Sequence, residues 1–286
     1  MRHAAAHVGG VAVATLAAHV VSGVAAATVA FYMARRGIGA LFPHVPRRQR
    51  SVAALAAVSF SHNVFVTTTA MRIARYRTLL EGDPQWLVEV PGFELPALAC
   101  VSFFLFDVWM SRLWTQWSWV LAAHHAFSIF CLAGGALTGA GQVWLAYALS
   151  TELSSTFLSC RTLIALLGDK SSAAYAIVTA LFALSFLLFR TLPLPFLLRA
   201  WLRQPPIGAA ACGPTRMAQV MGPMSLLHPI MNAHWTVAIV RVALRRRGGR
   251  SGERAQRAHA KSGENGHPTG GAAGGGSRRN AGRKGE

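Results

Sequence analysis

The sequence predicts an all-α fold, a polytopic membrane bundle of about seven transmembrane helices. Composition carries the first part of this prediction: 53% of the 286 residues are hydrophobic and only 13% are charged, which is not the balance of an ordinary soluble domain. Segment length carries the second part, because several uncharged apolar runs reach the roughly 20 residues that a helix needs to cross hydrocarbon. The chain is therefore expected to be an integral membrane protein.

The spans follow from the charged and helix-breaking residues that interrupt the apolar sequence. No Asp, Glu, Lys or Arg occurs between Arg2 and Arg35, so this segment is expected to be a retained first span rather than a cleaved signal. A row of tryptophans marks the membrane surface after the third span, and prolines end the sixth. Glycines are expected to break the chain before the fifth span: Gly134, Gly135, Gly139 and Gly141. The predicted spans are 8–34, 51–71, 92–111, 117–132, 143–160, 173–192 and 217–244.

These spans divide the chain into three parts. Residues 1–49 are predicted to hold the first span and a basic loop, and 50–247 the remaining transmembrane helices. Residues 248–286 form a basic, glycine-rich tail with almost nothing apolar to bury, so we expect it to be disordered. The net charge of +18 lies largely in this tail and in short loops, which favours contact with anionic lipid headgroups over binding of nucleic acid.

The distribution of Lys and Arg predicts the orientation. The loops on the two sides carry equal numbers of basic residues when Arg190 is counted as a loop residue. The basic cluster at 245–257, directly after the seventh span, breaks the tie and predicts a cytosolic carboxyl terminus. The final residues, Arg-Lys-Gly-Glu, are similar to a dibasic retrieval signal of the endoplasmic reticulum.

Ionisable residues inside the predicted spans are the candidates for a functional site. Each costs roughly 2.5 to 3.5 kcal/mol on insertion scales, so such residues usually face a protein-lined cavity. His124 and His125 are neighbours and point about 100° apart on a helix, yet both are expected to border one cavity. Ser128 lies one turn beyond His124 and widens the polar face. The alternative is a pair of histidines that serve only packing.

A second polar group lies in the fifth predicted span, where Glu152, Thr156 and Ser159 share one helical face. A buried carboxylate takes up a proton or finds a cation, and Arg161 and the histidine pair are the candidate partners. Asp107 lies near the end of the third predicted span. It is either part of the site or a carboxylate near the lipid headgroups, and the sequence favours neither alternative.

Two other predicted spans contribute polar residues. Each of these residues either lines the cavity or is a core residue whose hydrogen bonds are satisfied, and the sequence favours neither alternative. The residues are His62 in the second predicted span and His228, Asn232 and Trp235, which share one face of the seventh. The scattered cysteines show no CxxC pair and are expected to be small core residues: Cys100, Cys131, Cys160 and Cys212. No metal site is expected, because the histidine pair offers too few ligands.

Several short motifs occur in a fixed order between residues 50 and 247. They are SFSH at 59–62, FFLFDVWM at 103–110, HH at 124–125, LSTELSSTFLSCR at 149–161, Tyr175 and NAHW at 232–235. In these motifs the chain resembles the TLC-domain family, which includes ceramide synthases, translocation-associated membrane proteins and small TLC-domain proteins. The resemblance implies a TLC-type helical bundle in the endoplasmic reticulum or a related membrane that handles sphingolipid, ceramide or acyl lipid.

The resemblance leaves two functions open. The first is lipid binding without chemistry, which would contribute to membrane lipid homeostasis and needs no cofactor. Its expected lipid-binding residues are His62, Ser128, Thr156, Ser159, His228, Asn232 and Trp235.

The second, implied by the ceramide synthases, is N-acyl transfer to a sphingoid base with acyl-CoA as co-substrate. His124 or His125 would be the general base, oriented by Glu152 or Asp107. The synthases carry acidic residues downstream of the pair in the same motif, whereas here no Asp or Glu follows His125 until Glu152. Lipid handling is therefore the first expectation.

Overall fold

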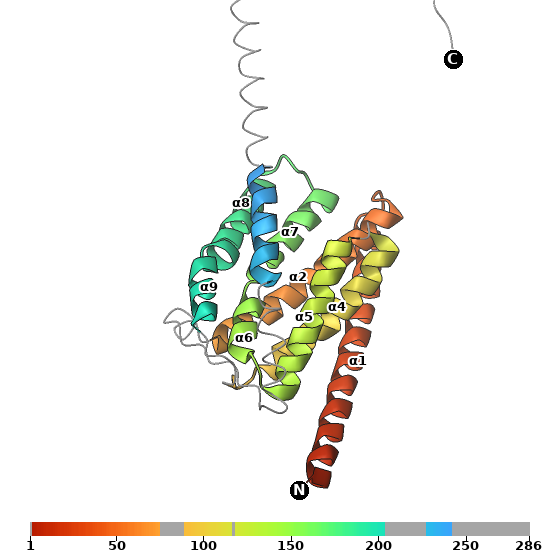
Figure 1. The fold of residues 1–286 in the computed structure, drawn as a ribbon. Helices are drawn as coiled ribbons and strands as arrows, with labels where there is room; N and C mark the ends of the chain where they lie inside the picture. Colours follow the sequence, from red (N-terminus) through yellow and green to blue (C-terminus); the bar gives the residue numbers. More distant parts are fainter. Residues whose placement is uncertain (1, 75–88, 116–117, 204–226, 242–286) are drawn as a thin grey trace, which may run out of the picture. The chain divides into compact units, whose positions relative to one another are not determined.

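The computed structural model describes residues 2–74, 89–115, 118–203 and 227–241, and the elements in these ranges are helical (Figure 1). The chain consists of two compact units, Met1–Thr236 and Val237–Glu286. The fold and the candidate site lie in the first unit. The helices are α1 (Arg2–Leu41), α2 (Arg47–Ile73), α4 (Glu94–Trp114), α5 (Trp119–Thr138), α6 (Gln142–Ser150), α7 (Leu153–Leu167), α8 (Ala173–Phe186), the π-helical turn η1 (Leu187–Thr191) and α9 (Leu194–Leu202). A further helix occupies 227–241.

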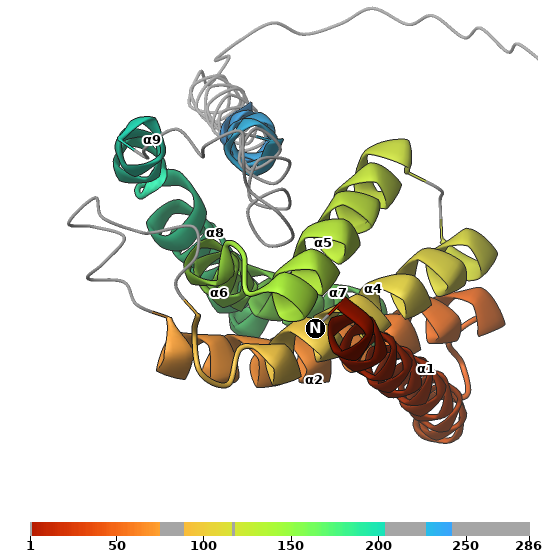
Figure 2. The ribbon, with the colours of Figure 1, turned by 60° about the horizontal axis from the view of Figure 1, so that its bottom comes forward.

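Helix α2 packs against helices from both the amino-terminal and the carboxyl-terminal part of this unit. It packs against α1 and α4 and also against α6 and α7. Figure 2 shows α1 and α4 toward one end of α2, and α6 and α8 toward the other. The remaining principal contacts join α1 to α4, α4 to α5, α5 to α6 and α7 to α8.

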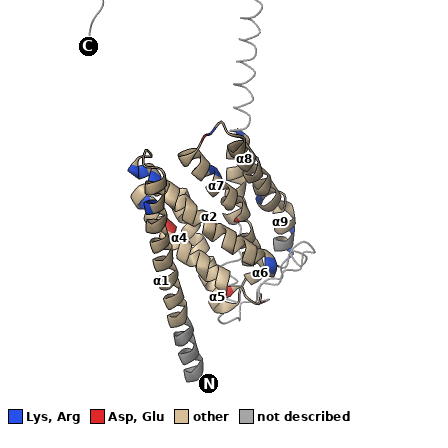
Figure 3. Cartoon of the chain, turned by 180° about the vertical axis from the view of Figure 1, so that it is seen from behind, with Lys and Arg blue, Asp and Glu red and all other residues tan. Residues whose placement is uncertain are grey.

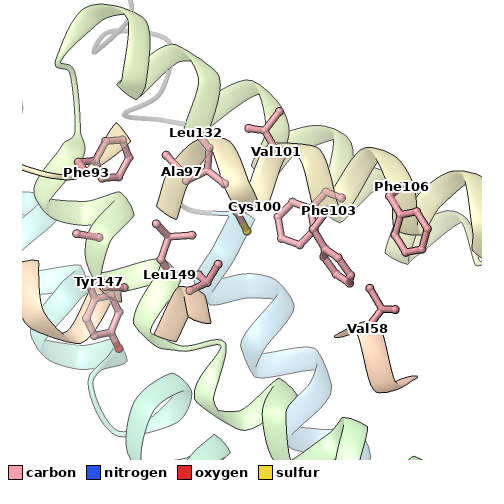
Figure 4. Packing of buried hydrophobic residues seen from close by; sticks show 14 of the residues in the cluster. Val58, Phe93, Ala97, Cys100, Val101, Phe103, Phe106, Leu132, Tyr147 and Leu149 are labelled. Atoms are coloured by element: carbon pink, nitrogen blue, oxygen red, sulfur yellow. The ribbon is translucent and has the colours of Figure 1, made fainter. Parts of the chain in front are cut away.

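The apolar core lies around α4. Figure 4 shows Phe103 and Phe106 of α4 near Val58 of α2, while Leu132 of α5 and Leu149 of α6 lie further along the same cluster. All five side chains are at most 9% exposed. Because lipid tails are as apolar as these side chains, close packing rather than exclusion of water holds such helices together.

Five helical segments among the described residues are long and apolar enough to cross a membrane. They are Val13–Leu41, Arg47–Ile73, Glu94–Trp114, Trp119–Thr138 and Ala173–Arg199. The prediction of an all-α membrane bundle is therefore confirmed. The seventh predicted span, 217–244, is helical over its described part, 227–241, whereas Cys212 and the predicted tail at 248–286 lie outside the described residues.

The fifth predicted span is not one continuous helix, as the sequence suggested for 143–160. Helix α6 ends at Ser150 and α7 begins at Leu153. The Thr151 N–H donates to the Ala148 carbonyl only three residues back, at 3.1 Å, and the Thr151 hydroxyl donates to the same carbonyl at 2.7 Å. Side-chain hydroxyls that bond the backbone in this way compete with α-helical hydrogen bonds, so the hydroxyl-rich stretch tightens and breaks.

The break before α6 also falls later than predicted. Gly134 and Gly135 are buried inside α5 rather than in a turn. The turn is made by Gly139 and Gly141, whose φ angles of 75° and 69° lie in the left-handed region that favours glycine. Gly135 still needs to be small, since an added Cβ would lie 3.1 Å from the carbonyl oxygen of Ala140.

Basic residues gather where α1 ends and α2 begins (Figure 3). They are Arg35, Arg36, Arg47, Arg48 and Arg50. Arg50 closes the connection by donating from Nε to the Val45 carbonyl at 2.6 Å. The Arg35 guanidinium lies 4.6 Å from the ring centroid of Trp114 at the end of α4. A tryptophan beside arginines at helix ends is typical of the membrane surface.

Candidate functional site

A cavity lies among α4, α5, α6, α9 and the helical segment 227–241. Its volume is about 120 Å³, which is far more than one water molecule needs. Most of the lining is apolar and includes Phe104, Phe127, Leu132, Leu145, Leu197 and Leu198. The cavity also brings together predicted site residues from separate parts of the chain: His124, Ser128, Glu152 and His228.

The cation that pairs with Glu152 is Arg190, which lies near the end of the predicted sixth span and was counted with the loop residues in the prediction of orientation. Arg190 lies in η1 and is only 4% exposed. Its Nη2 donates to Glu152 Oε1 at 3.0 Å. Arg161, a candidate partner from the sequence, lies instead over the ring of Tyr175, 5.3 Å from its centroid. The two buried charges of the pair thus compensate each other, as charges at this depth require.

Arg190 also satisfies polar groups around the break between α6 and α7. Its Nε donates to the carbonyl of Thr151 at 3.3 Å and to the hydroxyl of Ser154 at 2.9 Å. Its Nη2 donates to the Ser155 hydroxyl at 3.3 Å, and its Nη1 to Asn232 Oδ1 at 3.5 Å. Irregular backbone at membrane depth is tolerated where protein groups satisfy it, and the planar fork of one guanidinium does so here.

His124 faces the cavity and is held among aromatic rings. Its ring centroid lies 6.2 Å from that of Phe104 and 5.5 Å edge-on from that of Trp235. Trp235 does not line the cavity, but its ring centroid also lies 5.9 Å from the Arg190 guanidinium carbon. The indole of Trp235, from the helical segment 227–241, therefore contacts both the imidazole and the guanidinium.

His125 does not line the cavity, contrary to the expectation that both histidines border it. Its Nε2 donates to Asp107 Oδ2 at 2.9 Å, and its ring stacks on Phe104 at 4.5 Å. Its Nδ1 is buried and has no hydrogen-bond partner in the described part of the chain. Asp107 is 15% exposed at its side chain and pairs with histidine. Because adjacent residues diverge on a helix, the two imidazoles share Phe104 as a neighbour but differ in their polar partners and in access to the cavity.

The remaining predicted site residues lie outside the cavity lining. The His62 ring stacks on Phe103 with 4.0 Å between centroids, and its Nε2 is buried without a partner among the described residues. The Ser159 hydroxyl donates to Ser59 Oγ at 3.1 Å and joins α7 to α2. The Thr156 hydroxyl donates to the carbonyl four residues back at 3.3 Å. The His62 and Ser159 contacts therefore join separate helices, whereas the Thr156 hydrogen bond lies at the start of α7.

Gln142 is a buried polar residue that the sequence reading missed. Its Nε2 donates to the Gly135 carbonyl at 3.0 Å, and its Oε1 accepts the Val90 N–H at 2.7 Å. It therefore fixes the turn between α5 and α6 beside the cavity wall. Cys100 and Cys131 line the same wall as free, buried thiols, in keeping with small apolar residues.

Comparison with known proteins gives one match. A family model described as the TLC domain matches residues 51–241. No curated protein and no solved structure matches the chain. The matched residues include all the helices that contribute to the cavity and leave out α1.

Proposed function

Since the chain belongs to the TLC-domain family and is a multi-pass membrane protein, we propose that it binds a lipid in its intramembrane cavity. Binding of this lipid would contribute to the homeostasis of sphingolipid or acyl lipid in the membrane. The observation that carries the proposal is the composition of the cavity wall, which is apolar except for a small group of polar side chains.

Such a wall suits an amphiphile. Leucine and phenylalanine side chains from α4, α5, α6 and α9 accept an alkyl chain, while Glu152, His124 and His228 supply polar contacts for a head group. The ion pair between Arg190 and Glu152 keeps the carboxylate in a fixed position. A cavity with few polar groups on rigid helices orients a ligand without any chemical step.

The test fills the cavity with a side chain. Ser128→Phe places an aromatic ring in the cavity, whereas Ala126→Phe adds the same ring at an exposed position of the same helix. Full-length protein is purified in mild detergent and its bound lipid is extracted and measured by mass spectrometry. We expect the native chain and Ala126→Phe to retain lipid and Ser128→Phe to lose most of it. Equal lipid in all three proteins, or none in the native chain, would refute the proposal.

A second candidate function, N-acyl transfer to a sphingoid base, is favoured by the hydrogen bond between Asp107 and His125. A carboxylate that orients an imidazole is a common arrangement of a general base. The test incubates purified protein with sphingoid base and acyl-CoA, with His125→Ala as the comparison. Product that disappears in the variant would establish acyl transfer, and no product over a range of acyl chain lengths would exclude it.

We place the protein in the endoplasmic reticulum or a related endomembrane, with its carboxyl terminus in the cytosol. The family resemblance and the basic cluster at 245–257 support this placement, and the same cluster would contact anionic headgroups. Protease protection of a carboxyl-terminal tag in sealed microsomes tests the orientation. If the microsomal membrane protects the tag from added protease, the carboxyl terminus lies in the lumen and the predicted orientation is wrong.

A further inference from the structure

The charges around the cavity restrict which lipid can enter it. Within the described part of the chain, Glu152 is the only carboxylate that lines the cavity, and no Lys or Arg does. Arg190 pairs with Glu152, and its other contacts are with protein groups. The pair is neutral as a whole, so a charged head group would enter without a counter-charge. Burial of an uncompensated charge is strongly unfavourable.

The cavity nevertheless offers hydrogen-bonding capacity at Glu152. Its Oε1 accepts from Arg190, and the two oxygens of a carboxylate together offer about four acceptor positions, so the ion pair leaves acceptor capacity unused. The side chain is 14% exposed, and Glu152 is part of the cavity lining. An acceptor is therefore open to a ligand that can donate.

A second polar atom also lacks a partner. His228 lines the same cavity, and its Nε2 is buried without a hydrogen bond among the described residues. Buried polar atoms in native proteins are nearly always bonded, so the Nε2 of this cavity-lining residue is a candidate hydrogen-bond contact for a ligand. A hydroxyl or an amide can bond both Glu152 and His228, because each carries a donor and an acceptor.

We infer that the cavity takes a neutral lipid whose head group carries a hydroxyl or an amide, and that it discriminates against lipids with charged head groups. This inference rests on the proposed function. A fatty acid would place its carboxylate beside Glu152, where like charges repel. A protonated amine would add a positive charge to a site in which Arg190 already compensates Glu152.

The experiment compares three probes with the same alkyl chain length and different heads: monopalmitoylglycerol, palmitate and palmitylamine. Each is titrated, in radiolabelled form, into the full-length protein reconstituted in nanodiscs of a phosphatidylcholine. We expect monopalmitoylglycerol to bind at least about tenfold more tightly than either charged probe, because a lost hydrogen bond together with an unpaired charge exceeds that factor.

Two leucine variants on one helix test the contribution of His228. His228→Leu should weaken binding of monopalmitoylglycerol about tenfold and change binding of palmitate by less than about twofold, because only the neutral head uses the nitrogen. The matched control is His234→Leu, which replaces an exposed histidine of the same helix and should change neither affinity.

The outcomes separate this inference from the proposal on which it rests. If none of the three probes binds, lipid binding itself is refuted. If palmitate or palmitylamine binds as tightly as monopalmitoylglycerol, lipid binding stands and selectivity for a neutral head is refuted. If His228→Leu and His234→Leu leave the affinity for monopalmitoylglycerol equally unchanged, His228 has no role in recognition of the head group.

Discussion

Removal of Arg190 should strongly destabilise the bundle. Arg190→Met keeps an unbranched side chain of similar length but leaves the carboxylate of Glu152, which is 14% exposed, without its cation. It also removes the donors that bond the Thr151 carbonyl and the Ser154 hydroxyl. Breaking a buried pair by removing one partner costs about 3–5 kcal/mol, which for a domain of this size lowers the melting temperature on the order of 10 °C.

The assay is thermal unfolding in detergent, followed by loss of the monomer peak on size-exclusion chromatography. Arg161→Met is the matched control, because Arg161 makes a cation–π contact with Tyr175 and the change should cost only about 0.5–1 kcal/mol. The double variant Arg190→Met with Glu152→Gln should recover part of the loss, since it no longer buries an unpaired charge. The reasoning is refuted if Arg190→Met costs no more than Arg161→Met, or if the double variant is as unstable as the sum of its single changes.

Two further predictions concern the polar residues Gln142 and Asp107. Gln142→Leu should destabilise the protein by about 1–3 kcal/mol in the same unfolding assay, because the buried N–H of Val90 loses its acceptor, and an unchanged melting temperature would contradict this role. Asp107→Ala should cost a similar amount, about 1–3 kcal/mol, because His125 loses its acceptor. It should also leave the lipid content measured by mass spectrometry unchanged, since His125 lies outside the cavity lining; an emptied cavity would show that the two regions are coupled.

The sequence indicated most of the helices because their signals are local. An uncharged apolar run longer than a bilayer is thick needs no knowledge of its neighbours to be identified as a span. The cost of placing a carboxylate or an imidazole in such a run is equally local, so Glu152, His124 and His228 could be singled out as site candidates from the sequence. All three lie on the cavity wall.

The sequence did not predict the features that depend on contacts between different helices. Arg190 stands near the end of an apolar run, where an arginine normally extends toward the membrane surface, and nothing in its spacing relates it to Glu152. The hydroxyl-rich stretch around Glu152 indicated a polar interior, but not which residue supplies the cation. The break at Thr151 was missed because the sequence does not show that the Arg190 guanidinium joins the Ser154 N–H and hydroxyl in bonding the Thr151 carbonyl.

By itself, then, the sequence determined an all-α membrane bundle and the set of costly polar residues within it, since transfer free energies belong to single residues and short segments. Only the tertiary structure decided that His124 faces the cavity while His125 pairs with Asp107, and that Arg190 neutralises Glu152. Those outcomes depend on the rotation and packing of helices far apart in the chain. Such packing is fixed by contacts between helices rather than by the composition of any one of them.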